Sequence, residues 1–560
     1  MRSQVLSTMP ESSGHVTRHD RLLVTVLWLA AAAVCWWSVQ PGEWLPSGWL
    51  GLLGMVWVGL VVRAAIGARS GRVFFVACWV LLAASWLVVL SWVGDISIAG
   101  LPPLAVYSAA YSAVGGLLIR WWYRGSKHLP LSVAVGVIGL SLEYIRGEVL
   151  FDAWPFYLAG HPLWGSQLAM LASWGGVWAC SLLIFACGGA FAGVLLGHAW
   201  RVVAWSLIFP AVLIGVALLS PTPIPTGHDP LRVLVVQTNL PQDNKMGWPL
   251  DRQQSDIESF LALTASGLAE GSAADLVVWP ETMVPGLGFD RPTMAFLDSF
   301  GPQADDIARL PRVLIQSAEA SGTNWLVGAP TWSGVTLEDS VLTAAHRFNS
   351  AVLIGPDGSL QRYDKTFLTP FGETMPYVRS WPWLESLVMD FGARGMRFDL
   401  DVGSTWQPLT LSTDAAGQWQ LATPICFEAA VPSVTRTLCV EAGRTRVDAM
   451  INISNDGWFG ASDAGRATHA VAAAFRAVEM GRPLVRVANT GVSGLFLPDA
   501  SSVGSLPPRE AGTLLMNMPR YDGQTLYASW GNWLPRLSLI MLVLGIVIRR
   551  VRPAHRVARL

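Results

Sequence analysis

Long apolar runs constrain this chain more than any other feature of its sequence. An α-helix needs about 20 apolar residues to cross the roughly 30 Å hydrocarbon core of a bilayer. Seven runs close to this length precede residue 220 and one more lies near the end, at residues 22–39, 48–66, 72–93, 101–122, 129–145, 167–197, 201–219 and 533–548. Only 14% of the 560 residues are charged, whereas soluble domains carry about 25%. The sequence therefore predicts a polytopic α-helical membrane domain.

The segment between the seventh and the eighth run has a different pattern. Short strand-like and helix-like segments alternate there with Gly, Pro and Asp turns, which is typical of an α/β domain. We expect a seven-helix transmembrane domain at 1–220, an α/β domain at 221–528, and a transmembrane helix with a basic tail at 529–560. The net charge of -1 argues against a nucleic-acid partner, because binding to phosphates requires a basic surface.

The positions of the basic residues predict how the chain is oriented. Arginine and lysine gather before the first run, in the even-numbered loops and in the tail, at Arg2, Arg18, Arg21, Arg63, Arg69, Arg72, Arg120, Arg124, Lys127, Arg201, Arg549, Arg550, Arg552, Arg556 and Arg559. By the positive-inside rule both termini are cytoplasmic, and the 221–528 domain lies on the outer side of the membrane. We expect the first run to be retained, because no small-residue cleavage site follows it.

Cys426 ends a predicted strand in the stretch QLATPICFEA. A buried cysteine is often a small core hydrophobe. A disulfide with Cys439, the other cysteine of the 221–528 domain, is a second interpretation, which an oxidising compartment would permit. Cys439 falls in a predicted helix at 432–443, so the two side chains need not converge. A reactive nucleophile, with the carboxylate of Glu428 two residues away, is the third interpretation.

Lys365 and Glu281 also follow predicted strands. Only three of the 38 basic residues are lysines, and Lys365 comes after a predicted hairpin with a Pro-Asp-Gly turn. An ammonium is a compact point charge that suits a developing oxyanion, and a solvated lysine at a strand end is the alternative. Glu281 follows an apolar strand that Pro280 ends. A partly desolvated carboxylate there suits a general base, and an acid in the first turn of a helix is the alternative.

A Glu, a Lys and a Cys in this order, each at or past a strand end, resemble the triad of the nitrilase (carbon–nitrogen hydrolase) superfamily, whose fold is an αββα sandwich. The segments INISNDGWFG at 451–460 and RATHAVAAAFRAVEMGRPLVRVANTGVSG at 466–494 support the resemblance. Together with the seven N-terminal runs and the C-terminal run, the chain resembles the apolipoprotein N-acyltransferase family. Further matching stretches are VLVVQTNLPQDNKMGW, WPET, RYDKTFLTPFGETMP, ICFE and EYIRGEVLFDAWPF.

This resemblance implies an enzyme of the bacterial inner membrane that needs no metal or other cofactor. The family moves an acyl chain from a phospholipid, expected here to be phosphatidylethanolamine, to the N-terminal amine of diacylglyceryl-cysteine in apolipoproteins. The resemblance implies Cys426 as the nucleophile that carries a thioester, Glu281 as the general base and Lys365 as the oxyanion partner. It also implies supporting carboxylates at Glu373 and Glu428, and substrate contacts at Trp248, Phe427 and Trp458.

The sequence departs from the family in two places. The residue after the nucleophile is commonly Tyr and is Phe427 here, and the stretch 284–320 is longer than usual. The aromatic stretch 371–395 is amphipathic, which predicts either a lid that dips into the membrane interface or an ordinary packed segment.

Two other functions are alternatives. A membrane-anchored nitrilase-type amidase would use the same triad with water as the acceptor. A polytopic transporter would bury ionisable residues within its spans. The candidates for such residues are few, because Arg63 lies near the end of a run, and Glu143 and Arg146 lie at the outer boundary, where lipid headgroups would meet them.

Overall fold

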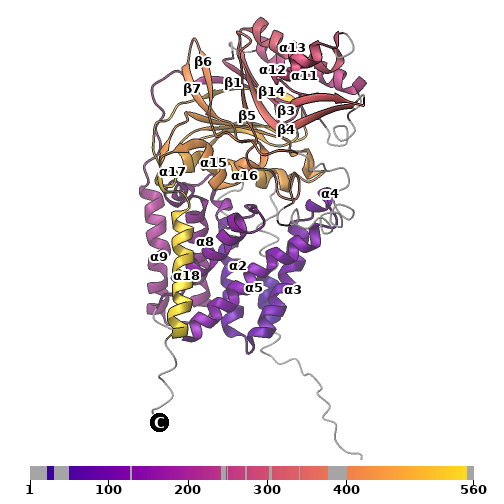
Figure 1. Ribbon diagram of the computed structural model, residues 1–560. Helices are drawn as coiled ribbons and strands as arrows, with labels where there is room; N and C mark the ends of the chain where they lie inside the picture. Colours follow the sequence, from indigo (N-terminus) through magenta and orange to yellow (C-terminus); the bar gives the residue numbers. More distant parts are fainter. Residues whose placement is uncertain are drawn as a thin grey trace, which may run out of the picture.

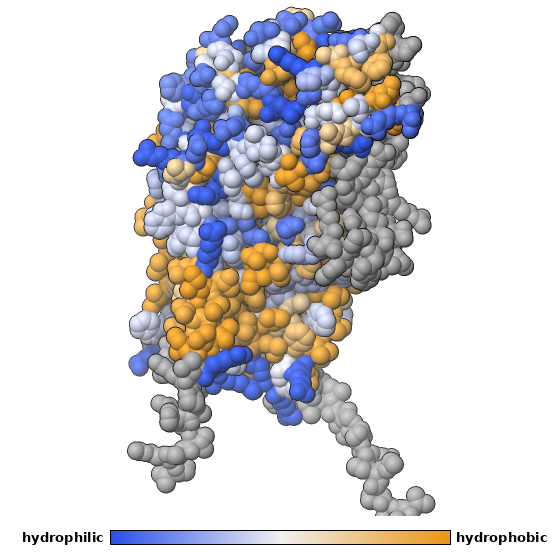
Figure 2. Space-filling view, in the orientation of Figure 1, coloured by the Kyte–Doolittle hydropathy of each residue, from blue (hydrophilic) through white to orange (hydrophobic). Residues whose placement is uncertain are grey.

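A helical bundle carries an α/β domain at one end (Figure 1). The computed structural model describes residues 22–30, 50–125, 129–240, 248, 250–270, 274–301, 305–339, 341–375, 377 and 400–551. Most of the predicted lid at 371–395, the rest of the first apolar run and the tail after residue 551 lie outside the described residues. Hydrophobic residues cover the surface of the bundle, and hydrophilic residues predominate over the α/β domain (Figure 2).

The long helices of the bundle pack side by side. They are α2 (Leu50–Gly67), α3 (Gly71–Val89), α5 (Leu101–Gly125), α6 (Leu131–Tyr144), α8 (Val177–Leu195), α9 (Trp200–Leu219) and α18 (Trp533–Val551). α3 packs on α5, α8 packs on both α2 and α6, and α18 packs on α6. Contact between α18 and α6 joins the end of the chain to its N-terminal half.

Four of the described helices are long and apolar enough to cross a membrane, namely α3, α5, α8 and α9. The apolar helical segment Leu53–Gly67 of α2 is shorter, and α6 has 14 residues before it continues as a π-helix at Ile145–Val149. The run at 167–197 is divided, because Gly176 adopts a φ of +71° between α7 (Ala172–Gly175) and α8. The number of crossings therefore stays a prediction.

The α/β domain contains two six-stranded mixed sheets. The first has the order β14 (Gly512–Met518), β1 (Leu231–Gln237), β2 (Leu276–Val278), β3 (Asn324–Glu338), β4 (Val341–Ile354) and β5 (Leu360–Asp364). The second has the order β13 (Ser502–Leu506), β12 (Ser493–Phe496), β11 (Leu484–Ala488), β10 (Ala449–Ser454), β7 (Gly417–Ala422) and β6 (Leu409–Thr413). The central strands β10 and β11 are buried along their whole length and β1 at every residue except Arg232, as expected for apolar strands with both faces covered.

Helices cover the outer face of each sheet, so the domain is an αββα sandwich (Figure 1). α11 (Leu250–Glu270), α12 (Arg291–Asp298) and α13 (Asp305–Ser321) lie over the first sheet. α15 (Pro432–Cys439) and α16 (Asp463–Met480) lie between the second sheet and the bundle. The predicted fold class is confirmed, and so is the hairpin with the Pro-Asp-Gly turn, which joins β4 to β5.

Glu143 and Arg146 are buried, so the expectation that lipid headgroups meet them is wrong. The loop after α6 folds back over them, and its backbone forms hydrogen bonds with both side chains. Arg146 donates hydrogen bonds to the carbonyls of Phe156 at 2.9 Å and Tyr157 at 3.0 Å. Glu143 accepts one from the backbone N–H of Ala159 at 2.7 Å. These charges anchor a loop that lies beneath the α/β domain.

Candidate active site

Glu281, Lys365 and Cys426 come from the ends of strands in both sheets. Glu281 follows β2 and is 4% exposed, and Lys365 directly follows β5 and is 1% exposed. Cys426 lies in the turn after β7, where Ile425 forms an isolated bridge with Ile453 at the end of β10. Two buried ionisable groups from the first sheet therefore converge with a thiol held by the second.

Lys365 is surrounded by polar groups that we call the lysine cluster: Glu281, Asn349, Lys365 and Glu373. The Lys365 ammonium lies 2.7 Å from Glu373 Oε2 and 3.5 Å from Glu281 Oε1. The amide of Asn349 donates to Glu281 Oε1 at 2.7 Å and to Glu373 Oε1 at 3.3 Å. With two carboxylates and one ammonium, the cluster carries one negative charge in excess when all three groups are ionised.

The lysine cluster sets the charge states around the thiol. Burial by itself lowers the pKa of Lys365, but Glu373 and Glu281 more than offset it, and the pKa is raised above its usual value. Burial favours neutral Glu373, but Lys365 holds the pKa of this carboxyl below its usual range. Burial raises the pKa of the Cys426 thiol, and Glu281 raises it further. The thiol is therefore protonated at neutral pH and needs a base before it can attack.

The backbone presents Cys426 on a sharp turn. Cys426 has a φ of +52°, in the left-handed region, and begins the 3-10 helix η6 (Cys426–Ala429). This conformation is uncommon for a residue other than glycine and persists only where the surroundings enforce it. Both Cys426 and Cys439 are free thiols, so the two are not joined in a disulfide.

Glu428 enforces this turn by joining it to the loop that carries Lys365. Its Oε2 accepts from the backbone N–H of Ile425 at 2.8 Å. Its Oε1 accepts from the N–H of Thr366 at 2.8 Å, the N–H of Phe367 at 3.0 Å and the hydroxyl of Tyr363 at 2.8 Å. Burial raises the pKa of Glu428, whereas these donors favour its ionised form. This carboxylate therefore holds the turn at Cys426 and the loop after Lys365 together.

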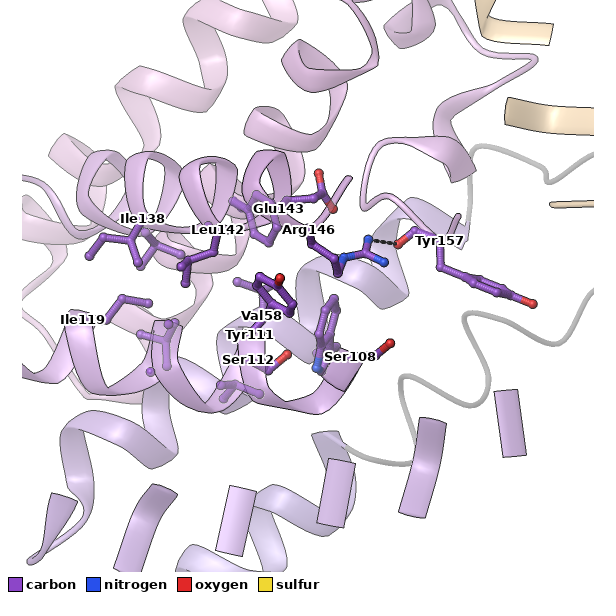
Figure 3. Close-up of a pocket in the computed structure, with 18 of the residues that line it drawn as sticks. Val58, Ser108, Tyr111, Ser112, Ile119, Ile138, Leu142, Glu143, Arg146 and Tyr157 are labelled. Carbon is purple, nitrogen blue, oxygen red and sulfur yellow. Dashed lines mark hydrogen bonds between the residues drawn. The ribbon is translucent and has the colours of Figure 1, made fainter. Parts of the chain in front are cut away.

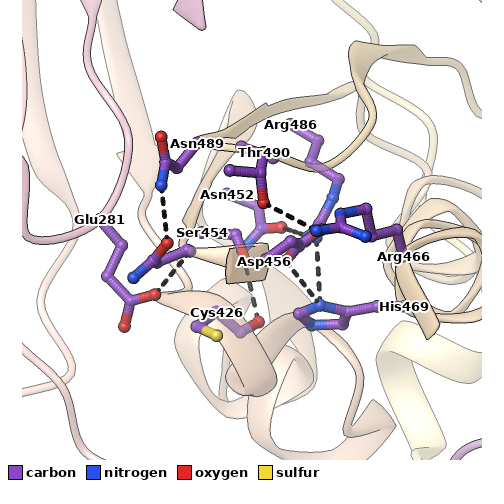
Figure 4. A network of polar contacts seen from close by, with 12 residues as sticks. Glu281, Cys426, Asn452, Ser454, Asp456, Arg466, His469, Arg486, Asn489 and Thr490 are labelled. Atoms are coloured by element: carbon purple, nitrogen blue, oxygen red, sulfur yellow. Dashed lines mark hydrogen bonds and ion pairs between the residues drawn. The ribbon is translucent and has the colours of Figure 1, made fainter. Parts of the chain in front are cut away.

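A second buried group of polar side chains lies behind the turn, and we call it the arginine cluster: Asn452, Asp456, His469 and Arg486 (Figure 4). Arg486 Nη2 donates to Asp456 Oδ2 at 2.7 Å and to Oδ1 at 2.9 Å, and Nη1 donates to Asn452. His469 Nδ1 lies 3.1 Å from Asp456 Oδ1. Against burial, Arg486 and His469 hold the pKa of Asp456 well below its usual range. Burial and Arg486 lower the pKa of His469, so it is neutral.

One loop connects the two clusters. The backbone N–H of Asn455 donates to Glu281 Oε2 at 2.7 Å, and the next residue is Asp456. The Asn455 side chain accepts a hydrogen bond from Asn489 at 3.0 Å (Figure 4). The orientation of Glu281 therefore depends on β10 and β11 as well as on its own strand.

The three aromatic residues proposed for substrate contact lie in different places. Phe427 is buried against Phe156 of the loop after α6, with ring centroids 5.8 Å apart. Trp458 is half-buried in the 3-10 helix η7 (Asp456–Phe459). Trp248 packs near α11, where its indole N–H donates to Asp256 at 2.8 Å. Their roles in substrate binding stay predictions.

Sequence reasoning did not identify Asn349, and it assigned no role to His469, Arg486 or Asn489. Asn349 lies inside β4, and nothing near it in the sequence indicates that its amide faces two carboxylates. The other three belong to the quoted segment 466–494, where an arginine and a histidine among apolar residues were the available signal. Within the described residues, no group of three or more His, Cys, Asp and Glu side chains is arranged to hold a metal ion.

Two family profiles match the chain. Residues 31–190 match the apolipoprotein N-acyltransferase N-terminal domain, and residues 235–526 match the carbon-nitrogen hydrolase family. The chain is 30% identical to the apolipoprotein N-acyltransferase of Rhodopseudomonas palustris over 483 residues, which is 83% of this chain and 81% of that protein. It is 31% identical to that of Azotobacter vinelandii over 480 residues, 83% of this chain and 82% of the relative.

The chain is less similar to solved structures. An amidase from Nesterenkonia sp. is 18% identical, with 53% of this chain and 93% of the amidase covered and a TM-score of 0.34. A carbon-nitrogen hydrolase from Helicobacter pylori is 14% identical, with 59% and 95% covered and a TM-score of 0.31.

Proposed function

The chain belongs to the apolipoprotein N-acyltransferase family, and from this premise we propose a two-step acyl transfer through a thioester on Cys426. The protein is a bacterial membrane protein and an N-acyltransferase, and family membership favours transfer over the anchored amidase. The acyl acceptor is an apolipoprotein with a diacylglyceryl-cysteine at its N-terminus. The proposed donor is a membrane phospholipid, with phosphatidylethanolamine as the first choice.

In the first step, the Cys426 sulfur attacks the ester carbonyl of the phospholipid. Glu281 takes the thiol proton as the carbon–sulfur bond forms, which is required because the thiol is protonated at rest. The oxyanion of the tetrahedral intermediate lies against the Lys365 ammonium and a backbone N–H near Cys426. The carbon–oxygen bond then breaks, and Glu281 returns the proton to the oxygen of the departing lysophospholipid.

In the second step, the α-amine of the diacylglyceryl-cysteine attacks the thioester carbonyl. Glu281 takes a proton from the attacking nitrogen and returns it to the Cys426 sulfur as the carbon–sulfur bond breaks. The products are the amide of the triacylated lipoprotein and the free thiol. The same carboxylate therefore serves as the base in both halves of the reaction.

The observation that carries this proposal is the buried lysine cluster beside a thiol, close to the contact between the α/β domain and the apolar helical bundle. Glu373 and Glu281 keep Lys365 charged, so a fixed positive charge is available for an oxyanion. Phe427, directly after Cys426, packs on a loop of the membrane domain, and this contact supports a lipid as the substrate of the thiol. The proposed orientation puts the α/β domain on the outer side of the membrane and both termini in the cytoplasm.

The reaction of the full-length protein with phosphatidylethanolamine alone, in mixed micelles, tests the proposal. We expect mass spectrometry to find one added acyl group on Cys426 that is lost slowly to water. Addition of a diacylated lipopeptide with a free N-terminal amine should discharge this group and yield a triacylated product. Release of the acyl group mainly as free fatty acid, or reaction of the thiol only with soluble amides, would show that the protein is a hydrolase instead.

A further inference from the structure

Glu148, in the membrane domain, binds a helix of the α/β domain. It lies on the π-helix η1 (Ile145–Val149). Its Oε1 accepts a hydrogen bond from the backbone N–H of Ser433 at 3.1 Å, and its Oε2 accepts one from the Ser433 hydroxyl. Ser433 is the second residue of α15, and the N-cap residue Val431 makes no side-chain hydrogen bond to this helix. A carboxylate of the bundle therefore binds an N–H that α15 cannot pair internally.

A second carboxylate makes the reverse contact. Glu479, near the end of α16, accepts a hydrogen bond at 2.8 Å from the backbone N–H of Val177, which begins α8 of the bundle. The N-cap residue of α8 is Gly176, which has no side chain to supply this contact. Each domain thus caps a helix of the other, and these two contacts fix the position of the α/β domain on the bundle.

The bundle holds the segment that carries Glu148 in place. Arg146, two residues earlier on the same π-helix, is buried and donates hydrogen bonds to the carbonyls of Phe156 and Tyr157 (Figure 3). π-Helices are rare and frequently lie at functional sites. Because Arg146 anchors this turn, Glu148 is a fixed point of attachment for α15.

α15 is closely connected to the turn that presents the nucleophile. Only Ala430 and Val431 separate it from η6, which begins at Cys426. In the first half of α15, the buried hydroxyl of Thr435 donates to the carbonyl of Glu428 at 2.8 Å. A displacement of α15 therefore displaces the turn that carries the thiol.

Other contacts fix the thiol relative to the base and the ammonium. Glu428 joins the Cys426 turn to the loop after Lys365, and the backbone N–H of Asn455 holds Glu281. All these groups belong to the α/β domain, so their mutual geometry does not require Glu148. The position of the thiol relative to a lipid does require a contact with the bundle, because the bilayer that surrounds the bundle sets the depth of a phospholipid ester.

We propose that Glu148 is a positioning residue, which acts through Ser433 and α15 to hold Cys426 where the ester carbonyl of the membrane phospholipid lies. The inference rests on the proposed function, because it concerns the same acylation of Cys426. It assigns the alignment of nucleophile and lipid to a side chain of the membrane domain, apart from the lysine cluster that performs the chemistry.

Glu148→Ala tests the proposal, and Glu338→Ala, at an exposed carboxylate at the end of β3, is its control. Two reactions of Cys426 are measured by mass spectrometry on full-length proteins in nanodiscs. One is acylation by phosphatidylethanolamine in the bilayer, and the other is alkylation by iodoacetamide, a small soluble reagent that needs no bound lipid. We expect Glu148→Ala to lower kcat for acylation by about 10- to 100-fold with KM unchanged, and to leave the rate of alkylation unchanged. Glu338→Ala should match the wild type in both reactions.

Two further variants examine the contact itself. Glu148→Gln keeps an acceptor oxygen and should recover most of the acylation that Glu148→Ala loses. Ser433→Ala removes the hydroxyl but keeps the backbone N–H, so we expect a smaller loss. Because both side chains act through one contact, the double variant Glu148→Ala/Ser433→Ala should acylate no more slowly than Glu148→Ala alone.

The outcomes separate this inference from the proposed function. Acylation at the wild-type rate in a folded Glu148→Ala protein would overturn the inference. Equal losses of acylation and alkylation would also overturn it, since they would show a general effect on the fold. If Glu148→Ala does not fold, acylation at the wild-type rate in Ser433→Ala overturns it equally. Failure of the wild-type protein to form the thioester, with normal alkylation of Cys426, would count against the proposed function instead.

Discussion

The lysine cluster and the arginine cluster flank the same cysteine, yet they handle buried charge in opposite ways. In the lysine cluster, two carboxylates share one compact ammonium, and an excess negative charge remains beside the thiol. In the arginine cluster, the guanidinium of Arg486 contacts both oxygens of Asp456, and the neighbouring His469 is neutral. A planar fork fixes a carboxylate in one geometry, whereas an ammonium is a compact point charge on a flexible stem and constrains the orientation of its partners less. We therefore propose that the lysine cluster takes part in the reaction and that the arginine cluster holds the loop in place.

We expect the largest loss of activity from a substitution of the thiol itself, which tests the nucleophile without altering either cluster. Cys426→Ser leaves all their charges in place but replaces the nucleophile, so we expect acyl transfer to fall by about 10⁴-fold or more. Unfolding temperature and yield should stay near those of the wild type. Cys439→Ala is the matched control, since this thiol is buried at the end of α15 and outside the site. Full activity of Cys426→Ser would remove the residue as the nucleophile.

Glu281→Gln removes the excess charge of the lysine cluster and keeps the size of the side chain. Because one carboxylate moves the proton in both steps, we expect both acylation and deacylation to slow by about 10²- to 10⁴-fold. Mass spectrometry after incubation with phospholipid measures the first step directly. Normal accumulation of the acyl-enzyme would mean that another group activates the thiol and that the two clusters differ less than we propose.

Asp456→Asn tests the arginine cluster in the same way. The variant leaves Arg486 buried without its anionic partner, and breaking a buried pair from one side costs about 3–5 kcal/mol of unfolding free energy. We expect a large fall in stability, with substantial activity in the molecules that remain folded. Glu373→Gln in the lysine cluster is the comparator and should lose rate with a smaller change in stability. Equal stabilities for the two variants would contradict the proposal that the arginine cluster has the larger structural role.

A third buried ion pair, Arg476 and Glu479, lies at the contact between the α/β domain and the bundle. Unlike the two clusters, it is expected to make the stability of the protein depend on pH. Glu479 lies 2.9 Å from Arg476 and accepts a hydrogen bond from the N–H of Val177, the first residue of α8, at 2.8 Å. Burial raises the pKa of Glu479 to about 7 from 4.5. Between these values the folded state binds more protons than the unfolded state, so stability falls as pH rises through this window.

Glu479→Gln should flatten this pH dependence. At about 1.4 kcal/mol per unit of pKa, the wild-type protein should lose at most about 3.5 kcal/mol of unfolding free energy across the window, and none from this group above about pH 7. Unfolding midpoints in detergent over this pH range measure the effect. Glu338→Gln, at an exposed carboxylate, should keep the wild-type slope. A variant slope equal to that of the wild type would exclude Glu479 as its source.

The parts of the site that could be predicted are those whose position depends on residues nearby in the sequence. Each of Glu281, Lys365 and Cys426 follows a strand that its own neighbours specify, through apolar β-branched residues, a Pro-Asp-Gly turn or the stretch before ICFE. The placement of Glu373 beside Lys365 also depends on residues near in the chain. Asn349 could not be predicted, because its contact with Glu281 spans 68 positions and is created by the pairing of β4 with its neighbours.

The sequence by itself determined the apolar runs, the α/β segment between them and the order of the triad residues, because periodicity and turns are local properties of the chain. Only the tertiary structure decided that Arg146 anchors a loop and that Glu428 joins two loops, and only it assembled the arginine cluster behind the cysteine. Each of these depends on partners contributed by other elements. A buried charge is stable only where such partners meet it, and their meeting is set by the packing of whole sheets and helices.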